Sequence, residues 1–373
     1  MKSTLFRNDI KGIKTVVVKT GSRILTCSGH ELRVKNLVDD LATIHHSGVK
    51  VILVSSGAIA RGMSALNLQK RPEDIPLQQA CASIGQNGLM NLYQQHFTKQ
   101  NILIGQVLLT WDDLRNKKRY LNLRNTLFQL LECGCIPIVN ENDSVGIEEI
   151  QFGNNDVLGA QIALLTHADL FVNLTDVGGL YDKNPQKSAD ARHIPLVPMT
   201  SSSVQKFACD KKNNLSVGGM STKIKAAEMV TKAGIPTLIG NGFDSNLLSV
   251  IKDKNSATLF MPSPKKMPSK DRWLAFAGQS RGKIVVDQGA CSAIKNRGKS
   301  LLAAGIIDTC DNFKTGDMVD IVCIDGSPIA KGLVNFSSSE IQLIRGCNTK
   351  KLREKLGKIR FDEVILRDNM VVV

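Results

Sequence analysis

The sequence has few features of membrane, secreted or metal-binding proteins. It contains no apolar run near the roughly 20 residues that a helix needs to cross a bilayer, and its first nine residues lack the apolar segment of a secretory signal. Its six histidines and nine cysteines show none of the spacings that are typical of zinc sites. We therefore expect a globular cytoplasmic protein without a membrane segment, and no metal site built from protein side chains alone.

The cysteines also lack the pattern of a disulfide framework. Their number is odd, and Cys133 and Cys135 enclose a single residue instead of the two of a C-x-x-C motif. We expect the cysteines to be reduced residues of the core.

Positive charge is present in excess. The chain has 48 lysines and arginines against 34 acidic residues, a formal net charge of +14. Clustered basic residues bind nucleic-acid phosphates, but these lysines are spread along the chain, and only 5% of the residues are aromatic, which leaves few surfaces for stacking bases. A solvated basic surface is therefore favoured over a nucleic-acid interface, and the same charge would attract anionic small substrates.

Short apolar runs alternate with helical patterns over the first two thirds of the chain. The predicted strands are 16–18, 51–54, 102–109, 136–139, 170–174 and 235–239, and the predicted helices are 32–44, 77–97, 120–131, 155–166 and 224–233. This alternation predicts an α/β fold with a mainly parallel sheet sandwiched by helices. Ligands of such sheets bind outside the carboxyl ends of the strands, where this chain has polar loops.

The composition changes near residue 262. Residues 263–280 begin with proline, lysine and serine and are predicted to be a linker between a first domain, 1–262, and a second, 281–373. Short strand candidates at 283–287, 318–323, 329–334 and 363–366 predict that the second domain is a small β-rich barrel or sandwich.

The stretch 216–223 has the residue types of a phosphate-binding loop. Two glycines and a lysine precede a helical pattern, and backbone N–H groups at a helix start attract phosphate. The lysine, however, follows the hydroxyl residues instead of preceding them as in a P-loop. A glycine turn in which Ser221 or Thr222 caps the helix fits the local pattern equally well.

Taken together, the polar loops are far more specific than any one of them. The loops are Lys19-Thr20-Gly21-Ser22, Ser55-Ser56-Gly57-Ala58-Ile59-Ala60, Asn140-Glu141-Asn142-Asp143, Asn155-Asp156, Thr175-Asp176-Val177-Gly178-Gly179-Leu180-Tyr181 and Gly218-Gly219-Met220-Ser221-Thr222-Lys223. Their order resembles that of glutamate 5-kinases, which belong to the amino-acid kinase family. The segment from Gly282 resembles the PUA domain that many bacterial glutamate 5-kinases carry, so the resemblance covers nearly the whole chain.

The resemblance implies that ATP phosphorylates the γ-carboxylate of L-glutamate to L-glutamyl 5-phosphate, the first step of proline biosynthesis. A carboxylate with a reference pKa of about 4.3 is already ionised at neutral pH, so this nucleophile needs no general base. One alternative is another amino-acid kinase, acting on acetylglutamate, aspartate or a nucleotide, although those families lack the C-terminal appendage. The other is an RNA-binding PUA protein with a vestigial kinase domain, against which the intact Lys19, Asp156 and Lys223 argue.

The resemblance also implies roles for individual residues. Lys19 and Lys223 would neutralise the phosphoryl group during transfer, and Asp156 would hold both ammonium groups in place. The glutamate-binding residues would be Ser56, Asn140, Asp143 and Asn155. The ATP-binding residues would be Lys19, Thr175, Asp176, Val217, Gly218, Gly219, Met220, Ser221, Thr222 and Lys223. Without the resemblance, residues 140–143 read as a polar turn and 154–156 as a helix cap.

Mg²⁺ is expected on the ATP phosphates, because substrate oxygens and few protein ligands commonly hold it. The family further implies a homo-oligomer, feedback inhibition by proline and a partnership with glutamyl phosphate reductase. RNA binding by the PUA-like domain competes with a regulatory or assembly role, which we favour. Glutamate 5-kinases usually have an aspartate in place of Asn154 and Gly-Thr in place of Ser216-Val217, and we expect these departures to change affinity more than reaction type.

Overall fold

The computed structural model describes the greater part of the chain. The described residues are 12–27, 29–146, 155–183, 185, 188, 190–198, 219–243, 246–253, 255–264, 266–357, 359 and 361–372. They form two compact units, and the main boundary lies between Met267 and Pro268. Within these ranges, no helix is long and apolar enough to cross a membrane.

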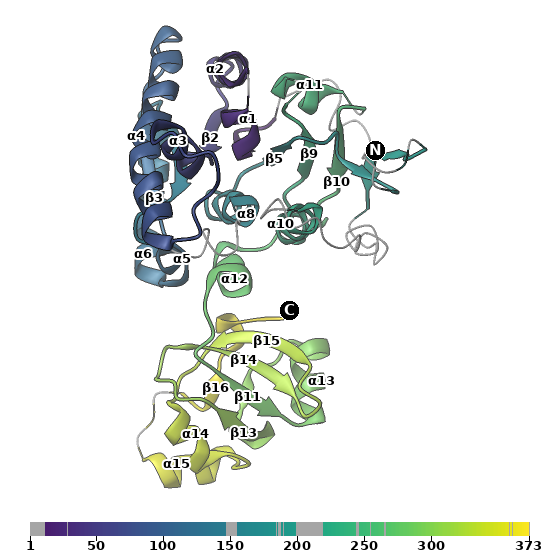
Figure 1. Ribbon diagram of the computed structural model, residues 1–373. Coiled ribbons are helices and arrows are strands. Elements are labelled where there is room, and N and C mark those ends of the chain that lie inside the picture. Colours follow the sequence, from purple (N-terminus) through teal and green to yellow (C-terminus); the bar gives the residue numbers. More distant parts are fainter. Residues whose placement is uncertain are drawn as a thin grey trace. The chain divides into compact units, whose positions relative to one another are not determined.

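The first unit is built on an eight-stranded sheet (Figure 1). Its strands, in spatial order, are β3 (Ile104–Leu109), β4 (Ile136–Glu141), β2 (Lys50–Val54), β1 (Thr15–Thr20), β5 (Leu170–Thr175), β9 (Thr237–Asn241), β10 (Ala257–Phe260) and β8 (Leu196–Val197). Among these strands, all pairings are parallel except that of β9 with β10. The predicted mainly parallel sheet is therefore confirmed, and β10 and β8 extend it beyond the predicted strands.

Helices cover both faces of this sheet, as predicted. They are α1 (Ser22–Thr26), α2 (His30–His46), α3 (Ala58–Ala65), α4 (Ile75–Lys99), α5 (Trp111–Arg115), α6 (Lys117–Glu132), α8 (Asn155–Leu165), α10 (Met220–Lys232) and α11 (Leu247–Lys252). A small hairpin of β6 (Leu180–Tyr181) and β7 (His193–Ile194) lies apart from the main sheet. In Figure 1, α8 and α10 lie side by side on one face, and α2 and α11 lie on the other.

Helix α8 is buried along its whole length, because it lies against the sheet and also packs against α10. A Cβ atom on Gly159 would be 3.1 Å from Cβ of Lys19 and 3.0 Å from Cε2 of Phe171, so glycine allows the helix to approach strands β1 and β5 closely. This close approach brings the first turn of α8 to the strand ends where the predicted site residues lie.

Helices α3 and α4 cross in direct backbone contact. A Cβ atom on Gly62 would lie 1.8 Å from the carbonyl oxygen of Cys81, and one on Gly85 would lie 1.8 Å from the carbonyl oxygen of Ala58. No larger residue fits at either position without moving a helix. The crossing therefore fixes α4 relative to the loop that joins β2 to α3.

The second unit contains a mixed five-stranded sheet in the order β13-β11-β14-β15-β17 and a two-stranded sheet of β12 and β16. Its elements are α12 (Ser269–Arg272), η1 (Trp273–Ala277), β11 (Gly282–Val286), α13 (Gln288–Arg297), β12 (Leu301–Leu302), η2 (Ala303–Gly305), β13 (Ile306–Cys310), β14 (Met318–Cys323), β15 (Pro328–Leu333), α14 (Ser338–Ile344), α15 (Thr349–Leu356), β16 (Glu363–Ile365), η3 (Arg367–Asn369) and β17 (Met370–Val372). The predicted β-rich domain is confirmed, and it has its own hydrophobic core.

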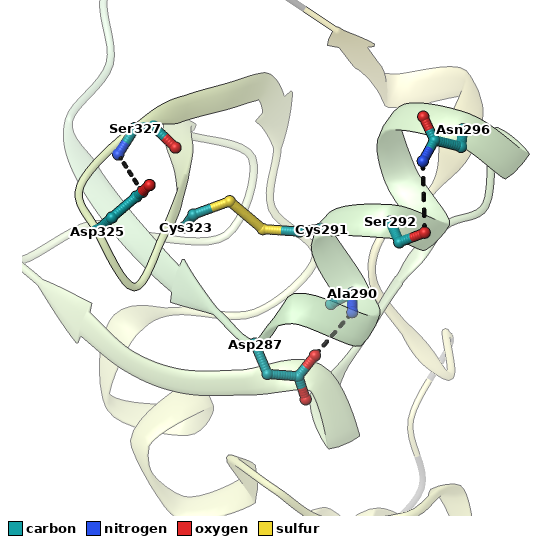
Figure 2. Close-up of a disulfide and its surroundings, with 8 residues drawn as sticks. All are labelled: Asp287, Ala290, Cys291, Ser292, Asn296, Cys323, Asp325 and Ser327. Carbon is teal, nitrogen blue, oxygen red and sulfur yellow. Dashed lines mark hydrogen bonds between the residues drawn. A yellow bond between two sulfur atoms is a disulfide. The ribbon is translucent and has the colours of Figure 1, made fainter.

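A disulfide joins Cys291 on α13 to Cys323 at the end of β14 (Figure 2). The expectation that the cysteines are reduced is wrong for this pair. They are 32 residues apart in the sequence, so no spacing motif indicates them, and only the packing of α13 near β14 brings their Cα atoms to 6.4 Å. The expectation of core positions is also wrong for Cys133 and Cys310, which are exposed.

Candidate active site

The carboxylate of Asp156 is the centre of a buried group of charges. Nζ of Lys19 lies 2.6 Å from its Oδ1, and Nζ of Lys223 lies 3.2 Å from its Oδ2. Oδ1 also accepts a hydrogen bond from the amide of Asn173 at 3.1 Å, and Oδ2 accepts one from the hydroxyl of Thr222 at 2.8 Å. We call these five residues the lysine cluster.

Strand register and helix position explain how the lysine cluster forms. Lys19 on β1 is paired with Asn173 on β5, so both side chains leave the same face of the sheet and reach the same carboxylate oxygen. Asp156 lies in the first turn of α8, where the helix dipole favours a negative charge. Residues of β1, β5 and α10 thus meet at one carboxylate of α8.

The electrostatics of the lysine cluster follow from its burial. Burial by itself would raise the pKa of Asp156, but the two ammonium groups outweigh it and hold the pKa well below its usual range. Burial lowers the pKa of Lys223, and the charge of Asp156 partly opposes this shift. Asp156 is therefore a permanent anion that keeps two cations in fixed positions.

The predicted phosphate loop continues into helix α10. The helix begins at Met220, with Gly219 as its N-cap residue and no side-chain capping bond. The interpretation in which Ser221 or Thr222 caps the helix is therefore wrong, because both lie inside its first turn. The hydroxyl of Thr222 instead donates to Asp156 or to the carbonyl oxygen of Gly219, which it approaches at 2.8 Å.

A second group of polar side chains surrounds Asn155, the neighbour of Asp156 on α8. The amide nitrogen of Asn155 donates to Oγ of Ser56 at 2.7 Å, to the carbonyl oxygen of Ser55 at 3.2 Å and to Oδ1 of Asn140 at 3.4 Å. The amide nitrogen of Asn140 in turn donates to Oε1 of Gln86 on α4 at 2.9 Å. We call Ser56, Gln86, Asn140 and Asn155 the amide network.

Comparisons with known proteins identify the family of the chain. Residues 14–241 match the amino acid kinase family, and residues 282–356 match the PUA domain. The chain is 44% identical to the glutamate 5-kinase of Syntrophus aciditrophicus, a match that covers 98% of this chain and 95% of that protein. The chain therefore belongs to the amino acid kinase family, among the glutamate 5-kinases.

Two further members of the glutamate 5-kinase family extend the comparison. The proteins of Carboxydothermus hydrogenoformans and Trichlorobacter lovleyi are each 40% identical to the chain over 98% of its length, and the matches cover 100% and 99% of those proteins. Full-length similarity of this kind includes the second unit as well as the kinase unit.

The carboxylates of two further predicted site residues, Asp143 and Asp176, lie in contrasting environments. Asp143 follows β4, and its Oδ1 is buried without a hydrogen-bond partner. Burial raises the pKa of Asp143 to about 7, although the positive charge of Arg71 opposes the shift. Asp176 follows β5, accepts a hydrogen bond from the hydroxyl of Thr175 at 3.1 Å and forms an ion pair with Arg23.

The structure brings the predicted catalytic residues together in one group and Ser56, Asn140 and Asn155 in an adjacent one. Asn154, Ser216, Val217 and Gly218 lie outside the described residues. Sequence reasoning missed Asn173 and Gln86. The sequence could have indicated Asn173, because it is a polar residue within the apolar strand β5. Gln86 could not be recognised in this way, because it is an ordinary polar residue of a long helix.

The side chains of the lysine cluster suit an anion and not a divalent cation. Ammonium, amide and hydroxyl donors surround Asp156, and both of its carboxylate oxygens already accept hydrogen bonds from them. Across the described ranges, no group of three or more His, Cys, Asp or Glu side chains could hold a metal ion. These residues fit an arrangement in which Mg²⁺ is held by nucleotide phosphates.

Proposed function

We propose that the lysine cluster catalyses transfer of the γ-phosphoryl group of ATP to the γ-carboxylate of L-glutamate. The membership of the chain in the glutamate 5-kinases gives the reaction, and the buried Asp156 with its two lysines is the observation that carries the assignment of residues. Because full-length relatives are glutamate 5-kinases, glutamate is favoured over acetylglutamate, aspartate or a nucleotide as the acceptor.

In this reaction an oxygen of the γ-carboxylate forms a bond to the γ-phosphorus, and the bond to the oxygen that leaves with ADP breaks. The carboxylate is already ionised, so no side chain has to remove a proton. The enzyme has to bring two anions together and neutralise the charge on the transferring group. The ammonium groups of Lys19 and Lys223 supply positive charge for this purpose from β1 and from α10.

Asp156 positions these charges and does not take part in bond formation. Its carboxylate binds Lys19 through one oxygen and Lys223 through the other, so that one negative charge holds both cations. Preorganised charges cost little reorganisation when the transition state forms. Mg²⁺, held by the ATP phosphates, would supply further charge neutralisation when bound.

The amide network and Asp143 are proposed to bind glutamate. Oγ of Ser56 accepts a hydrogen bond from Asn155, so its own proton is free to be donated to the reacting carboxylate. Oδ1 of Asn155 and Oδ1 of Asp143 are buried without partners and can accept hydrogen bonds from the α-ammonium group. Thr175, Asp176 and residues 217–222 are proposed to border the nucleotide.

The test is consumption of ATP with a panel of acceptors: L-glutamate, N-acetylglutamate, aspartate and UMP. Hydroxylamine added to the reaction traps any acyl phosphate as a hydroxamate. We expect hydroxamate and ADP with L-glutamate in preference to the other three acceptors. A preference for N-acetylglutamate or aspartate, or ADP release without hydroxamate, would contradict the proposal.

The remaining family expectations stay predictions. They are a homo-oligomer, inhibition by proline, a partnership with glutamyl phosphate reductase and RNA binding or regulation through the PUA domain. We also expect the reaction in the cytoplasm, where ATP and glutamate are available.

A further inference from the structure

The carbonyl group of Ser55 determines which atom is the donor in each hydrogen bond between the amide side chains of the network. The carbonyl oxygen of Ser55 can only accept, so the atom of Asn155 that faces it at 3.2 Å is the amide nitrogen. The same nitrogen faces Oδ1 of Asn140, which leaves the nitrogen of Asn140 for Gln86. Gln86 must then accept with Oε1 and keep its own nitrogen free.

The free nitrogen of Gln86 is buried. In the structure, Nε2 of Gln86 has almost no solvent exposure and no hydrogen-bond partner. Burying an unpaired donor costs about 1 to 3 kcal/mol, so proteins rarely leave one without a ligand or a water to receive it. The amide network thus ends in one unused donor, Nε2 of Gln86, and offers one unused acceptor, Oδ1 of Asn155.

Gln86 is half-buried as a residue, and its position is fixed by the packing of its helix. The preceding residue, Gly85, is in contact with the backbone of α3, which starts directly after the Ser55-Ser56-Gly57 loop. On the same helix, the hydroxyl of Tyr93 lies 2.9 Å from Oγ of Ser55. These contacts fix Gln86 relative to the other residues that are proposed to bind glutamate.

We propose that Nε2 of Gln86 donates a hydrogen bond to the α-carboxylate of the amino-acid substrate and so helps to select an α-carboxylate. This inference rests on the proposed function. The γ-carboxylate has to reach the lysine cluster, and the unpaired oxygens of Asn155 and Asp143 suit the α-ammonium group. The α-carboxylate is then the remaining group of glutamate that needs a donor. Counted along the hydrogen bonds from Ser56, Gln86 is the last residue of the amide network.

The first test replaces Gln86 by methionine, which has a similar shape and no donor. We expect Gln86→Met to raise KM for glutamate about 10- to 100-fold, the range for loss of a buried hydrogen bond to a charged group. The turnover number and KM for ATP should change little. Asn87→Leu is the matched control, because Asn87 is the exposed neighbour on the same helix.

The second test reverses the specificity. In Gln86→Glu the donor becomes an acceptor, which should disfavour the α-carboxylate of glutamate and favour the α-carboxamide of L-isoglutamine. We expect the ratio of kcat/KM for glutamate over isoglutamine to fall at least about tenfold relative to the wild type. Asn87→Asp controls for the added charge and should leave the ratio unchanged.

The outcomes separate this inference from the proposed function. If the wild type forms no hydroxamate with glutamate, the proposed function fails and the inference fails with it. If the wild type is active but both Gln86 variants keep the wild-type KM and substrate ratio, only the inference is overturned. Equal losses on glutamate and isoglutamine in Gln86→Glu would also overturn it, because Gln86 would then act only through Asn140.

Discussion

The lysine cluster and the amide network are centred on adjacent residues of α8, Asp156 and Asn155, yet these two side chains differ in how completely their polar atoms are paired. In the lysine cluster, both oxygens of Asp156 are bonded to cations and to neutral donors. In the amide network, Oδ1 of Asn155 and Nε2 of Gln86 remain buried and unpaired. The carboxylate of Asp156 is fully paired, although Oδ1 of Asn173 beside it is buried without a partner. The amide network offers both a buried donor and a buried acceptor to a ligand.

This difference follows from what each group is proposed to do. Charge stabilisation works best when the charges are already fixed, since no reorganisation is then needed during the reaction. Recognition gains most from unpaired buried groups, because a ligand that lacks the matching atom leaves them unsatisfied. We therefore expect changes in the lysine cluster to have larger effects than changes in the glutamate-binding residues or in the second unit.

Removal of the central charge should be the most damaging change. Asp156→Asn leaves two buried ammonium groups without an anion, and loss of one partner of a buried ion pair costs about 3 to 5 kcal/mol. We expect the free energy of unfolding to fall by this amount and the kinase activity to be lost. Urea unfolding of both proteins gives the first quantity. Unchanged stability would show that the lysines are solvated and not held by Asp156.

Loss of one cation should reduce turnover without unfolding the protein. We expect Lys223→Ala to lower kcat about 10²- to 10³-fold, the scale for loss of one preorganised charge-stabilising donor. KM for glutamate should change far less. Lys225→Ala is the matched control, since Lys225 is exposed on the same helix. A folded Lys223→Ala enzyme with near-normal turnover would refute the role of this lysine.

KM for glutamate should depend on pH, because Asp143 titrates near neutral pH. Its pKa is raised to about 7, so the carboxyl group is mostly neutral below that pH and becomes an anion above it. If the anion binds the α-ammonium group, KM for glutamate should fall about tenfold as the pH rises from about 6 to 8. The dependence should disappear in Asp143→Asn, and KM for ATP measured in parallel should not follow it.

Deletion of the second unit should have the smallest effect. The second unit has a separate hydrophobic core, and the described residues of both groups lie in the first unit. Because Ser263 and Met267 donate backbone hydrogen bonds to Thr231 and Ala233, the chain should end after residue 267 and not at 262. We expect kcat of this truncation within about threefold of the full chain, measured by the same ATP assay. A folded but inactive truncation would show that the second unit completes the site.

The strands with the clearest local signal were predictable. The run Val16-Val17-Val18 is β-branched and buried, and it forms β1 where the sequence indicates it. Shorter or less apolar segments were missed: β8 has two residues, and β13 has polar residues after its first two. Such segments become strands because a neighbouring strand offers hydrogen bonds, a property that no local pattern contains.

The residues of the candidate site likewise fall into those that the sequence could predict and those that it could not. Lys19, Asp156 and Lys223 were identified because their loops follow the order found in a known family. Gln86 was not identified, because its role depends on hydrogen bonds to Asn140 on β4 and, through it, to Asn155 on α8. The local alternative, in which Ser221 or Thr222 caps the helix, could be rejected only because α10 begins at Met220.

By itself, the sequence determined the class of fold and the family of the chain, because buried strands and polar loops leave patterns along a single stretch of residues. Tertiary structure alone decided which polar atoms are paired and which are left unpaired. It placed two lysines on opposite oxygens of Asp156 and left the nitrogen of Gln86 without a partner. The physical reason is that hydrogen bonding and burial depend on distances between elements that are far apart in the chain.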